Sequence, residues 1–592
     1  MRRGMFDMDE VTGRQLDWSL FRRFLGLVTP YRRNAAAAML LLPMATAARL
    51  LQPYLVKVAI DRHIVPGQLA GLEWVAALFL LTVCGESLLG FGQAYLAQSV
   101  GQRIMADLRR QGFARLLRLP VSFFDRHPSG RLVTRLSGDV ENVGELFGSG
   151  VAAAFGELFS LVFIVGLMWW LNPALTGVAF TLIPLLVLIL WLFRRSMRGA
   201  MRQVRARVAD LNGYLAERIA GIHEVRLFGQ EGRTLEEFGG LQENYRQSSF
   251  RAIHWDAFLF SALETLTALA IAGILWRGGS GVLAGTTTFG TLVAFVEYVQ
   301  RFFAPLRKLS AQYSLLQSSN ASLERLFQLL DEAPEASGSS PAAGRGALRL
   351  EQVCFSYDGR TPVLHDIDLA IEPGQTVALV GDTGSGKTTI GRLLLRFYAP
   401  ENGRILLDGV DLAGLEPELV RQRIGWVAQE PFLFSGTVRD NLDPRQQLDN
   451  GALLALIERC GCLRAVERLG GLEGRIEERG KNLSAGERQL LCLARALVQQ
   501  PALIVFDEAT SRLDVATEAL VRQEMELAQR GRSALIIAHR LRSVSHADCI
   551  HVLHHGRIRE RGSHAELLAA DGLYARLWRL QDLANGGISP GK

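Results

Sequence analysis

The sequence predicts a chain in two parts, an all-α membrane domain with six spans over residues 1–330 and an α/β domain over residues 348–592. Three observations predict this division. Hydrophobic residues make up 49% of the 592 residues, a high share for a soluble protein. Apolar runs long enough to cross about 30 Å of hydrocarbon occur only in the first part. Beyond a predicted linker rich in Ala, Ser, Gly and Pro, residues 331–347, short β-like runs alternate with helical ones, as in α/β domains.

Six apolar runs form the membrane part. Because the number is even, both ends of the chain are expected on one side of the membrane. Arginines cluster on that side, at residues 22–33, 103–135 and 194–207, and the intervening short loops are poorer in arginine. This bias predicts that both termini lie in the cytoplasm. The runs are residues 35–59, 72–97, 150–171, 174–194, 253–276 and 284–306.

Composition argues against several other classes of protein. The formal net charge is +6, and only five of the 65 basic residues are lysines. The arginines flank apolar segments and do not form one basic block with aromatic residues, so no nucleic acid partner is predicted. The six cysteines are scattered without the spacing of a metal site, as expected of reduced thiols in the cytosol. Residues 1–15 have no apolar core behind their arginines, which argues against a secretory signal or transit peptide.

Two long charged segments with a helical pattern lie on the cytoplasmic side, at residues 98–143 and 195–251. They predict that the spanning helices continue well beyond the bilayer. The first segment turns at LPVSFFDRHPSG, residues 119–130, where an aromatic pair and a Pro-Ser-Gly bend suggest a short docking helix. The second turns near residues 211–231. Taken alone, both turns could equally be solvated hairpins.

The stretch TVALVGDTGSGKTT, residues 376–389, has a β-rich run, a glycine loop and a helix start in the order that a phosphate-binding loop requires. Glycines let backbone N–H groups point at phosphate oxygens, and the helix N-terminus adds positive potential. The lysine supplies a compact cation, and the hydroxyl after it is predicted to bind Mg²⁺. A chance glycine turn is the competing interpretation. The predicted ATP-binding residues in this loop are Gly381, Asp382, Thr383, Gly384, Ser385, Gly386, Lys387, Thr388 and Thr389, of which Thr388 is also a predicted metal ligand.

The stretch PALIVFDEATSRLD, residues 501–514, supplies acidic groups. An apolar strand over residues 502–506 ends in two adjacent carboxylates. Asp507, at the strand end, is predicted to coordinate Mg²⁺ directly or through water. Glu508 is predicted to be the catalytic general base for an attacking water, a role worth about 10²- to 10⁴-fold in rate. A solvated acidic strand end is the alternative interpretation.

With these motifs, and others in fixed order around them, nearly the whole chain resembles an ATP-binding cassette (ABC) half-transporter of the exporter type. Tyr357 in CFSYDG matches the aromatic residue that stacks on adenine. Gln429 in WVAQEPFLF matches the glutamine that meets Mg²⁺ and couples the site to the membrane part. Asp514 ends the loop that crosses to the other subunit, and His539 in LIIAHRL matches the catalytic switch histidine near the γ-phosphate.

The resemblance implies a dimer, because each ATP then sits between the phosphate loop of one chain and the signature loop of the other. LSAGERQ matches that signature, usually LSGGQ, so Ser484 and Gly486 are expected to reach the γ-phosphate held by the partner. Ala485 and Glu487 depart from the pattern. Ala485 is unfavourable if the backbone there needs a positive φ, and Glu487 adds negative charge. We therefore expect a heterodimer more than a homodimer.

The same resemblance implies a helical subdomain in the α/β part and two coupling helices, at residues 120–130 and 211–221. It implies ATP and Mg²⁺ as cofactors. A hydrophobic or amphipathic substrate, namely a drug, lipid or peptide, would be exported across the inner (cytoplasmic) membrane of a bacterium, in contact with membrane lipids. An ATP-gated channel or a regulatory subunit on the same fold is the alternative.

Charged residues within or near the predicted spans are candidates for substrate contacts, because each needs a partner or water at that depth. Glu297 and Arg301 are four residues apart on one predicted helix and are expected to pair with each other. The full set is Arg49, Glu86, Glu157, Glu264, Glu297 and Arg301.

Overall fold

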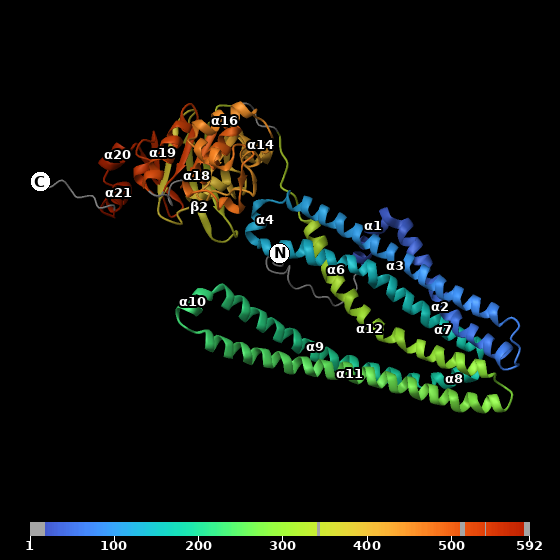
Figure 1. The fold of residues 1–592 in the computed structure, drawn as a ribbon. Helices are drawn as coiled ribbons and strands as arrows, with labels where there is room; N and C mark the ends of the chain where they lie inside the picture. The colour runs from blue at the N-terminus through green and yellow to red at the C-terminus, as the bar shows by residue number, and fades with distance from the viewer. Residues whose placement is uncertain (1–17, 340–343, 509–514, 539, 585–592) are drawn as a thin grey trace. The chain divides into compact units, whose positions relative to one another are not determined.

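The computed structural model describes residues 18–339, 344–508, 515–538 and 540–584, and the chain divides into two compact units (Figure 1). The first unit comprises Met1–Leu116 and Gly130–Asp331. The second comprises Leu117–Ser129 and Glu332–Lys592. The turn at residues 117–129, which the sequence assigns to the membrane part, thus packs with the α/β part.

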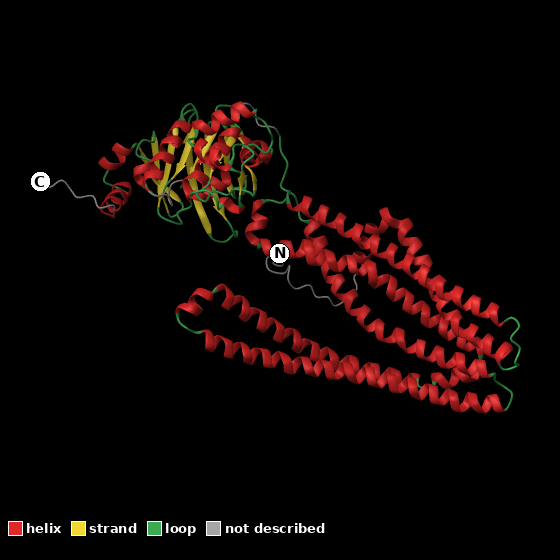
Figure 2. Cartoon of the chain, in the orientation of Figure 1, coloured by secondary structure: helices red, strands yellow, loops and turns green. Residues whose placement is uncertain are grey.

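Every regular element among the described residues of the first unit is helical, and short loops and turns join the helices (Figure 2). Its helices are α1 Trp18–Val28, α2 Arg32–Ala59, α3 Leu72–Leu116, α5 Ser129–Thr134, α6 Val140–Glu145, α7 Ala152–Leu171, α8 Pro173–Phe180, α9 Ile183–Ala220, α10 Ile222–Leu227, α11 Glu231–Leu283 and α12 Phe289–Asp331, with short 3-10 or π-helical segments at Thr29–Tyr31, Ile60–Ile64, Arg135–Asp139 and Leu146–Val151.

Five helical segments among the described residues are long and apolar enough to cross a membrane, and they correspond to the first five predicted spans. The predicted sixth span, residues 284–306, lies largely in α12. That helix begins only at Phe289, because Gly285 adopts a φ of +71° and Thr288 Oγ1 accepts the Thr291 N–H at 3.2 Å as an N-terminal cap. The five segments are Arg22–Ile64, Leu72–Leu116, Ala153–Leu171, Pro173–Ala220 and Glu231–Leu283.

The long helices α3, α9 and α11 run well beyond the apolar runs, over 45, 38 and 53 residues. The bend between α9 and α11 lies within the predicted turn at residues 211–231, but its short helix lies later than the predicted coupling helix at residues 211–221. Residues 211–220, expected to form the second coupling helix, continue α9, and the short helix of the bend is α10, Ile222–Leu227. The amphipathic pattern continues through residues 211–220, so α9 ends only at Gly221.

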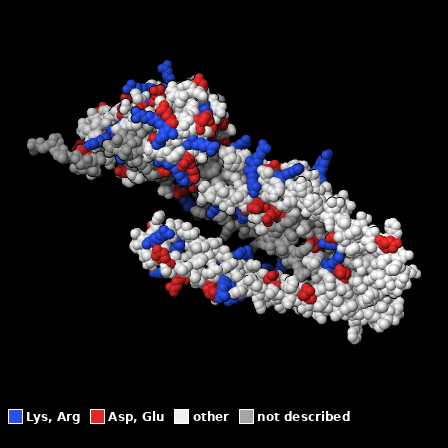
Figure 3. Space-filling view, in the orientation of Figure 1, with Lys and Arg blue, Asp and Glu red and all other residues white. Residues whose placement is uncertain are grey.

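The surface of this unit changes character along its length. Charged side chains gather at the α10 end of α9 and α11, and the other half of these helices is almost uncharged (Figure 3). Large apolar side chains are exposed there, with Trp276 at 85% and Trp191 at 55%. Exposed apolar area on this scale is favourable in lipid and unfavourable in water.

Polar groups within the bundle satisfy one another. The predicted ion pair of Glu297 and Arg301 is confirmed, at 3.7 Å. Arg301 also reaches α2, where it donates to the Arg49 carbonyl at 2.5 Å and to Gln52 Oε1 at 3.4 Å. Gln52 in turn donates to Glu86 at 2.7 Å. The Arg301 guanidinium therefore holds α12 against α2, which is a structural use of the charge.

The second unit is built on a six-stranded sheet of order β12-β11-β3-β10-β9-β6, a four-stranded sheet of order β2-β1-β4-β5 and the pair β7-β8. In the six-stranded sheet only the edge strand β12 is antiparallel to its neighbour. The strands are β1 Leu348–Ser356, β2 Pro362–Ile371, β3 Thr376–Gly381, β4 Asn402–Leu407, β5 Val410–Asp411, β6 Ile424–Val427, β7 Gly436–Thr437, β8 Arg475–Ile476, β9 Leu503–Asp507, β10 Ser533–Ile537, β11 Cys549–His554 and β12 Arg557–Gly562.

Helices α18 and α13 pack on opposite faces of this sheet. The helices of the second unit are α4 Val121–Arg126, α13 Lys387–Leu394, α14 Pro417–Arg423, α15 Val438–Leu442, α16 Asn450–Arg459, α17 Leu463–Leu469, α18 Ala485–Val498, α19 Val515–Gln529, α20 His564–Ala569 and α21 Leu573–Ala584, with 3-10 turns at Leu412–Gly414, Glu478–Gly480 and Leu541–Ser543.

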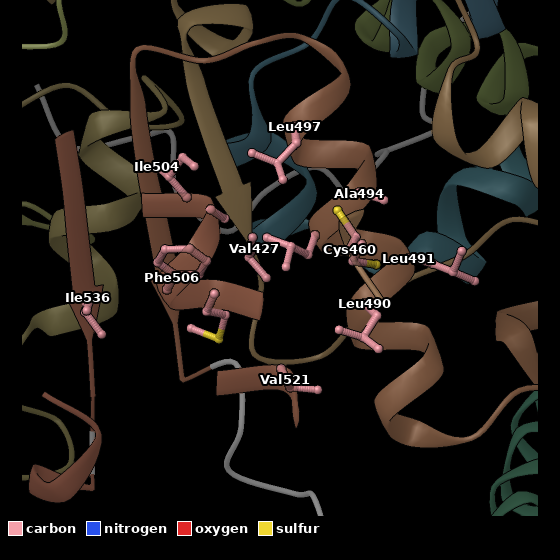
Figure 4. Close-up of a cluster of buried hydrophobic side chains, with 14 of the residues drawn as sticks. Val427, Cys460, Leu490, Leu491, Ala494, Leu497, Ile504, Phe506, Val521 and Ile536 are labelled. Atoms are coloured by element: carbon pink, nitrogen blue, oxygen red, sulfur yellow. The ribbon is translucent and has the colours of Figure 1, made fainter. Parts of the chain in front are cut away.

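The central strands are buried on both sides, as is usual for parallel strands. Along β3, Val377 and Leu379 face one apolar cluster, whereas Ala378 and Val380 face the other. In the second cluster, Phe506 of β9 lies with leucines of α18 (Figure 4). This shared core fixes the ends of β3 and β9, where the predicted site residues begin.

Candidate nucleotide site

The phosphate-binding loop lies between β3 and α13, and its glycines are required by its geometry. Gly384 and Gly386 have φ of +81° and +107°, which L-residues rarely adopt. A Cβ on Gly386 would also approach Leu364 Cδ2 to 2.6 Å, and one on Gly381 would approach the Leu553 carbonyl oxygen to 2.0 Å. The loop is therefore a tight cradle of backbone N–H groups at the start of a helix, as anion binding requires.

Lys387 is held inside this cradle. Its side chain is 4% exposed, and its Nζ donates to the carbonyl oxygens of Gly381 and Asp382, at 2.8 Å each. Burial lowers the pKa of Lys387 to about 8, although Asp382 and Asp507 act in the opposite direction. Phosphate oxygens can replace these carbonyl contacts and stabilise the ammonium form.

The Ser385 hydroxyl is buried, with the residue 4% exposed, and it has no hydrogen-bond partner among the described residues. An unpaired buried hydroxyl costs about 1–3 kcal/mol, and a phosphate oxygen would remove that cost. Together with the glycine cradle and Lys387, the Ser385 hydroxyl makes the loop fit the phosphates of a nucleoside triphosphate.

Thr388 and Asp507 bring together two oxygen ligands suited to Mg²⁺. Thr388 Oγ1 lies 3.5 Å from Asp507 Oδ1, at the end of β9. Burial raises the pKa of Asp507, while the Thr388 hydroxyl, Arg392 and Lys387 lower it. A hydroxyl and a buried carboxylate beside the phosphate cradle form the hard oxygen set that Mg²⁺ prefers.

Glu508 follows Asp507 and is directed away from it by an unusual backbone conformation. Its φ is +47°, and its N–H donates to the Ile537 carbonyl of β10 at 2.9 Å. A glutamate in the left-handed region carries strain, and such residues cluster at functional sites. Gln429 Nε2 donates to Glu508 Oε2 at 2.6 Å. The structure thus brings the predicted base and the predicted coupling glutamine together.

Tyr357, the predicted adenine-stacking residue, lies in an aromatic group. Its hydroxyl is 3.1 Å from that of Thr389 in the phosphate loop. The ring of Tyr398 meets it edge to face, with centroids 5.0 Å apart, and the Arg392 guanidinium lies 5.9 Å from its centroid. The ring is therefore fixed beside the phosphate loop, at a place suited to a nucleotide base.

Tyr398 and Arg392 were missed by the sequence reasoning, and both contact the turn at residues 117–129. The Tyr398 hydroxyl donates to the carboxylate of Asp125, a residue of α4, and Arg392 lies 3.7 Å from that carboxylate. Nothing local in the sequence indicates these contacts, because Asp125 and Tyr398 are 273 positions apart. His554, which lies 2.9 Å from Asp382 of the phosphate loop, was also missed.

The signature stretch begins α18, and Ser484 is its N-cap. The Glu487 N–H donates to Ser484 Oγ at 3.2 Å, and the Ser484 N–H donates to Glu487 Oε2 at 2.8 Å. This reciprocal capping box is readable in the sequence as S-x-x-E, a signal that the sequence reasoning did not use. Gly486 is buried in the first turn of the helix. Ser484 and Gly486 therefore lie at a helix N-terminus, where phosphate binds well.

Neither departure from the usual signature disturbs this turn. Ala485 belongs to α18 and is not among the residues with positive φ, so the predicted backbone cost does not arise. Partial burial of Glu487 raises the pKa of its carboxyl, but the Ser484 N–H and Arg468 outweigh it and hold the pKa below its usual range. Arg468 donates to Glu487 at 2.8 Å, so its negative charge is balanced locally.

Asp514 and His539 lie outside the described residues. Thr383, at the tip of the phosphate loop, is exposed. The roles of all these site residues remain predictions, and the geometry above brings together those of the phosphate loop with Tyr357, Gln429, Asp507 and Glu508. Ser484 and Gly486 open a separate helix.

Two family models, several relatives and a solved structure match this chain. The family model described as ABC transporter transmembrane region matches residues 36–306, and the model described as ABC transporter matches residues 364–511. An ATP-dependent lipid A-core flippase of Thiobacillus denitrificans is 34% identical over 95% of this chain and 98% of its own length. A fatty acid ABC transporter ATP-binding/permease protein of Mycobacterium bovis is 34% identical over 87% and 83%. The solved structure of a bacterial Atm1-family ABC exporter with ATP bound aligns with a TM-score of 0.78 at 27% identity, covering 95% of this chain and 99% of that one.

Proposed function

Since this chain belongs to the ABC transporter family, as a half-transporter with membrane and ATP-binding parts in one polypeptide, we propose that it exports a lipid-like amphipathic substrate from a bacterial cytoplasm. ATP hydrolysis is coupled to transport in this family. The observation that carries the proposal is one site formed by Lys387, Ser385, Thr388–Asp507 and Gln429–Glu508, in a chain whose described residues include five apolar helical segments of membrane length.

Each group of the site has a chemical task in this proposal. The Lys387 ammonium and the loop N–H groups bind and orient the phosphates, and they stabilise the charge that develops in the transition state. Mg²⁺, when held by Thr388 and Asp507, would neutralise phosphate charge. Glu508 takes the proton of the attacking water, and Gln429 orients the Glu508 carboxylate through its 2.6 Å hydrogen bond. His539 is proposed to complete the catalytic set near the γ-phosphate.

An amphipathic, lipid-like substrate is supported by the relatives that are named for a lipid A core and for fatty acids. It is also supported by the bundle itself, since its long apolar faces carry a few polar groups at depth, among them Arg49, which donates to Ser160 at 3.1 Å. We propose that both termini lie in the cytoplasm, on the basis of the arginine bias.

The functional unit is proposed to be a dimer, in which Ser484 and Gly486 of one chain complete the nucleotide site of the other. The predicted heterodimer rested on Ala485 and Glu487. Because Ala485 keeps an ordinary helical backbone and Glu487 is paired with Arg468, this signature is proposed to be competent. That the partner is a chain of different sequence stays a prediction. ATPase activity of the purified tagged chain alone would contradict this predicted heterodimer.

The export proposal is tested in liposomes with the purified tagged chain and any second half-transporter that copurifies with it, using fluorescent phosphatidylethanolamine and a fluorescent fatty acid as probes. We expect ATP-dependent movement of at least one probe across the bilayer. The variant Glu508→Gln should stop both hydrolysis and movement, and the matched variant Glu526→Gln, at an exposed position of α19, should retain them. Undiminished vectorial transport by Glu508→Gln would refute the export cycle, and passive ATP-gated leakage would identify a channel.

A further inference from the structure

A cavity of about 280 Å³ lies at the end of the bundle where α2, α7 and α12 are joined to their neighbours by short connections. This is the end opposite α10 (Figure 1), and on the predicted topology it faces away from the cytoplasm. Nothing in the nucleotide chemistry uses this cavity.

Lys57 is the one charged residue among the described residues that line the cavity. Its Nζ is 3.2 Å from Asp61 Oδ2. That carboxylate is shared, because it also accepts the Thr288 hydroxyl at 2.5 Å and the Gly290 N–H at 2.8 Å at the start of α12. The Lys57 ammonium has three N–H donors, and the Asp61 carboxylate is shared with the start of α12. Lys57 therefore keeps further N–H donors for the cavity.

The other polar lining groups are neutral and rigidly placed. Asn172 Oδ1 caps α8 by accepting the Leu175 N–H at 3.1 Å, and its Nδ2 donates to Thr287 Oγ1 at 3.2 Å. The Thr287 hydroxyl, acting there as acceptor, keeps its proton for a ligand. A lysine and a threonine hydroxyl without an acidic residue in the lining favour an anionic oxygen group over a cation.

The remaining wall is aromatic. Tyr54 and Trp170 lie with ring centroids 5.8 Å apart, and Trp170 is 67% exposed. Aromatic residues of this kind gather where bilayer and water meet. The cavity therefore offers cationic and hydroxyl donors on one side and an apolar ring surface that continues to the lipid-facing exterior on the other.

We infer that this cavity binds the anionic headgroup, phosphate or carboxylate, of an amphipathic molecule at the outer boundary of the membrane. Lys57 and Thr287 hold the headgroup, and the hydrocarbon chain of the amphipathic molecule lies along Trp170. If the cavity belongs to the transport path, the inference rests on the proposed export function. The substrate class is then an anionic amphipathic molecule. The headgroup comes either from the transported molecule or from a bilayer phospholipid.

The test measures binding of radiolabelled tetradecyl phosphate to the full chain in phosphatidylcholine nanodiscs without nucleotide, with tetradecyl maltoside as the uncharged probe. We expect Lys57→Gln to weaken phosphate binding about tenfold, the effect of losing a charge-assisted hydrogen bond, and Lys57→Arg to restore most of it. Thr287→Val should weaken binding without removing charge. Arg62→Gln removes an exposed charge five residues beyond Lys57, at a position that is not part of the cavity lining, and should have no effect.

Equal binding by wild type and a folded Lys57→Gln, or equal affinity for the two probes, would overturn the inference. Competition by phosphatidylglycerol would assign the headgroup to bilayer lipid, and ATP-driven export of tetradecyl phosphate would assign it to the transported molecule; both support the anionic site. Because binding is measured without ATP, a Lys57-dependent site in a chain that exports nothing would refute only the proposed function.

Discussion

The side-chain amide of Gln429 donates to the carboxylate of Glu508 at 2.6 Å, across the gap between the loop after β6 and the end of β9. The two residues are 79 positions apart. Glu508 has a left-handed backbone, at φ +47°, and its N–H donates to the Ile537 carbonyl. The predicted base therefore contacts Gln429, whereas the predicted metal ligand Asp507 lies beside Thr388.

This relationship predicts the effect of Gln429→Glu. Two carboxylates at hydrogen-bond distance cannot both ionise, so the acid limb of the ATPase pH profile should move to higher pH and activity at pH 7 should fall. Gln429→Ala removes the bond without adding charge and should lower kcat by about tenfold or more, the scale of one lost hydrogen bond to a charged group, with the acid limb in place. Measuring phosphate release from ATP between pH 5 and pH 9 distinguishes the Gln429→Glu variant from the Gln429→Ala variant. An unchanged acid limb for Gln429→Glu would mean that the two side chains do not meet during turnover.

Lys387 predicts a pH dependence of ATP affinity. Its folded pKa of about 8 lies below the usual value because of burial, so above pH 8 the unliganded site holds a neutral amine. ATP binding must then take up a proton, and affinity should fall by about tenfold per pH unit until the pKa of the complex is reached. The lowered pKa also means that the folded chain holds fewer protons than the unfolded chain between pH 8 and the usual lysine value, so this group favours folding more as pH rises there.

Calorimetry in buffers of different ionisation enthalpy measures this proton uptake directly. Near pH 9 the observed binding enthalpy should depend on the buffer, and near pH 6 it should not. The variant Lys387→Arg, whose side chain stays charged, is the control and should show no buffer dependence at either pH. Equal buffer dependence at both values would exclude Lys387 as the titrating group.

The nucleotide site was predictable because its chemistry is carried by contiguous residues. Residues 381–389 form one loop, and Asp507 and Glu508 end one strand, so the sequence order alone brings the donors together. The capping box of Ser484 and Glu487 is equally local. Its S-x-x-E pattern is readable in the sequence, although Glu487 also departs from the usual signature.

Contacts between distant segments could not be predicted in this way. Asp125 meets Tyr398 only because the turn at residues 117–129 packs with the second unit. The cavity beside Lys57 requires three segments, near residues 54–57, 170–172 and 286–291. The prediction of a coupling helix at residues 211–221 is wrong because the amphipathic pattern of α9 continues to Ala220, and such a pattern shows where a helix can continue but not where it ends.

Ser484→Ala should destabilise the ATP-binding part. The substitution removes the acceptor of the Glu487 N–H in the capping box, and loss of such a cap costs about 1 kcal/mol. Thermal unfolding of the chain should shift downward by a few degrees, and ATPase activity should fall further than stability alone explains if the hydroxyl also serves the partner's nucleotide. Ser563→Ala removes an equivalent capping box at α20 and is the matched control: it should reproduce the stability loss and leave activity nearly intact. Equal activity loss in both variants would limit Ser484 to capping.

The contact of Asp125 with Tyr398 predicts how the turn at residues 117–129 communicates with the nucleotide site. The Tyr398 ring packs on Tyr357 with centroids 5.0 Å apart, and its hydroxyl donates to Asp125. Partial burial, together with the bond to Asp125, raises the pKa of the Tyr398 phenol to about 12, so it remains a donor throughout the physiological range. Tyr398→Phe keeps the ring and removes only the donor. It should therefore leave ATP affinity nearly unchanged and lower the stimulation of ATPase activity by the proposed lipid-like substrate.

A double-mutant cycle with Asp125→Asn and Tyr398→Phe measures this coupling. We expect lipid-stimulated ATPase activity of the double variant to exceed the product of the two single effects, with a coupling energy of about 0.5–1.5 kcal/mol for one hydrogen bond. Asp358→Asn, at an exposed position near Tyr357, serves as the control and should act independently of Tyr398→Phe. Additive effects of Asp125→Asn and Tyr398→Phe would show that the bond is an incidental contact, and that any signal from this turn reaches Tyr357 through packing or through Arg392, which lies 3.7 Å from Asp125.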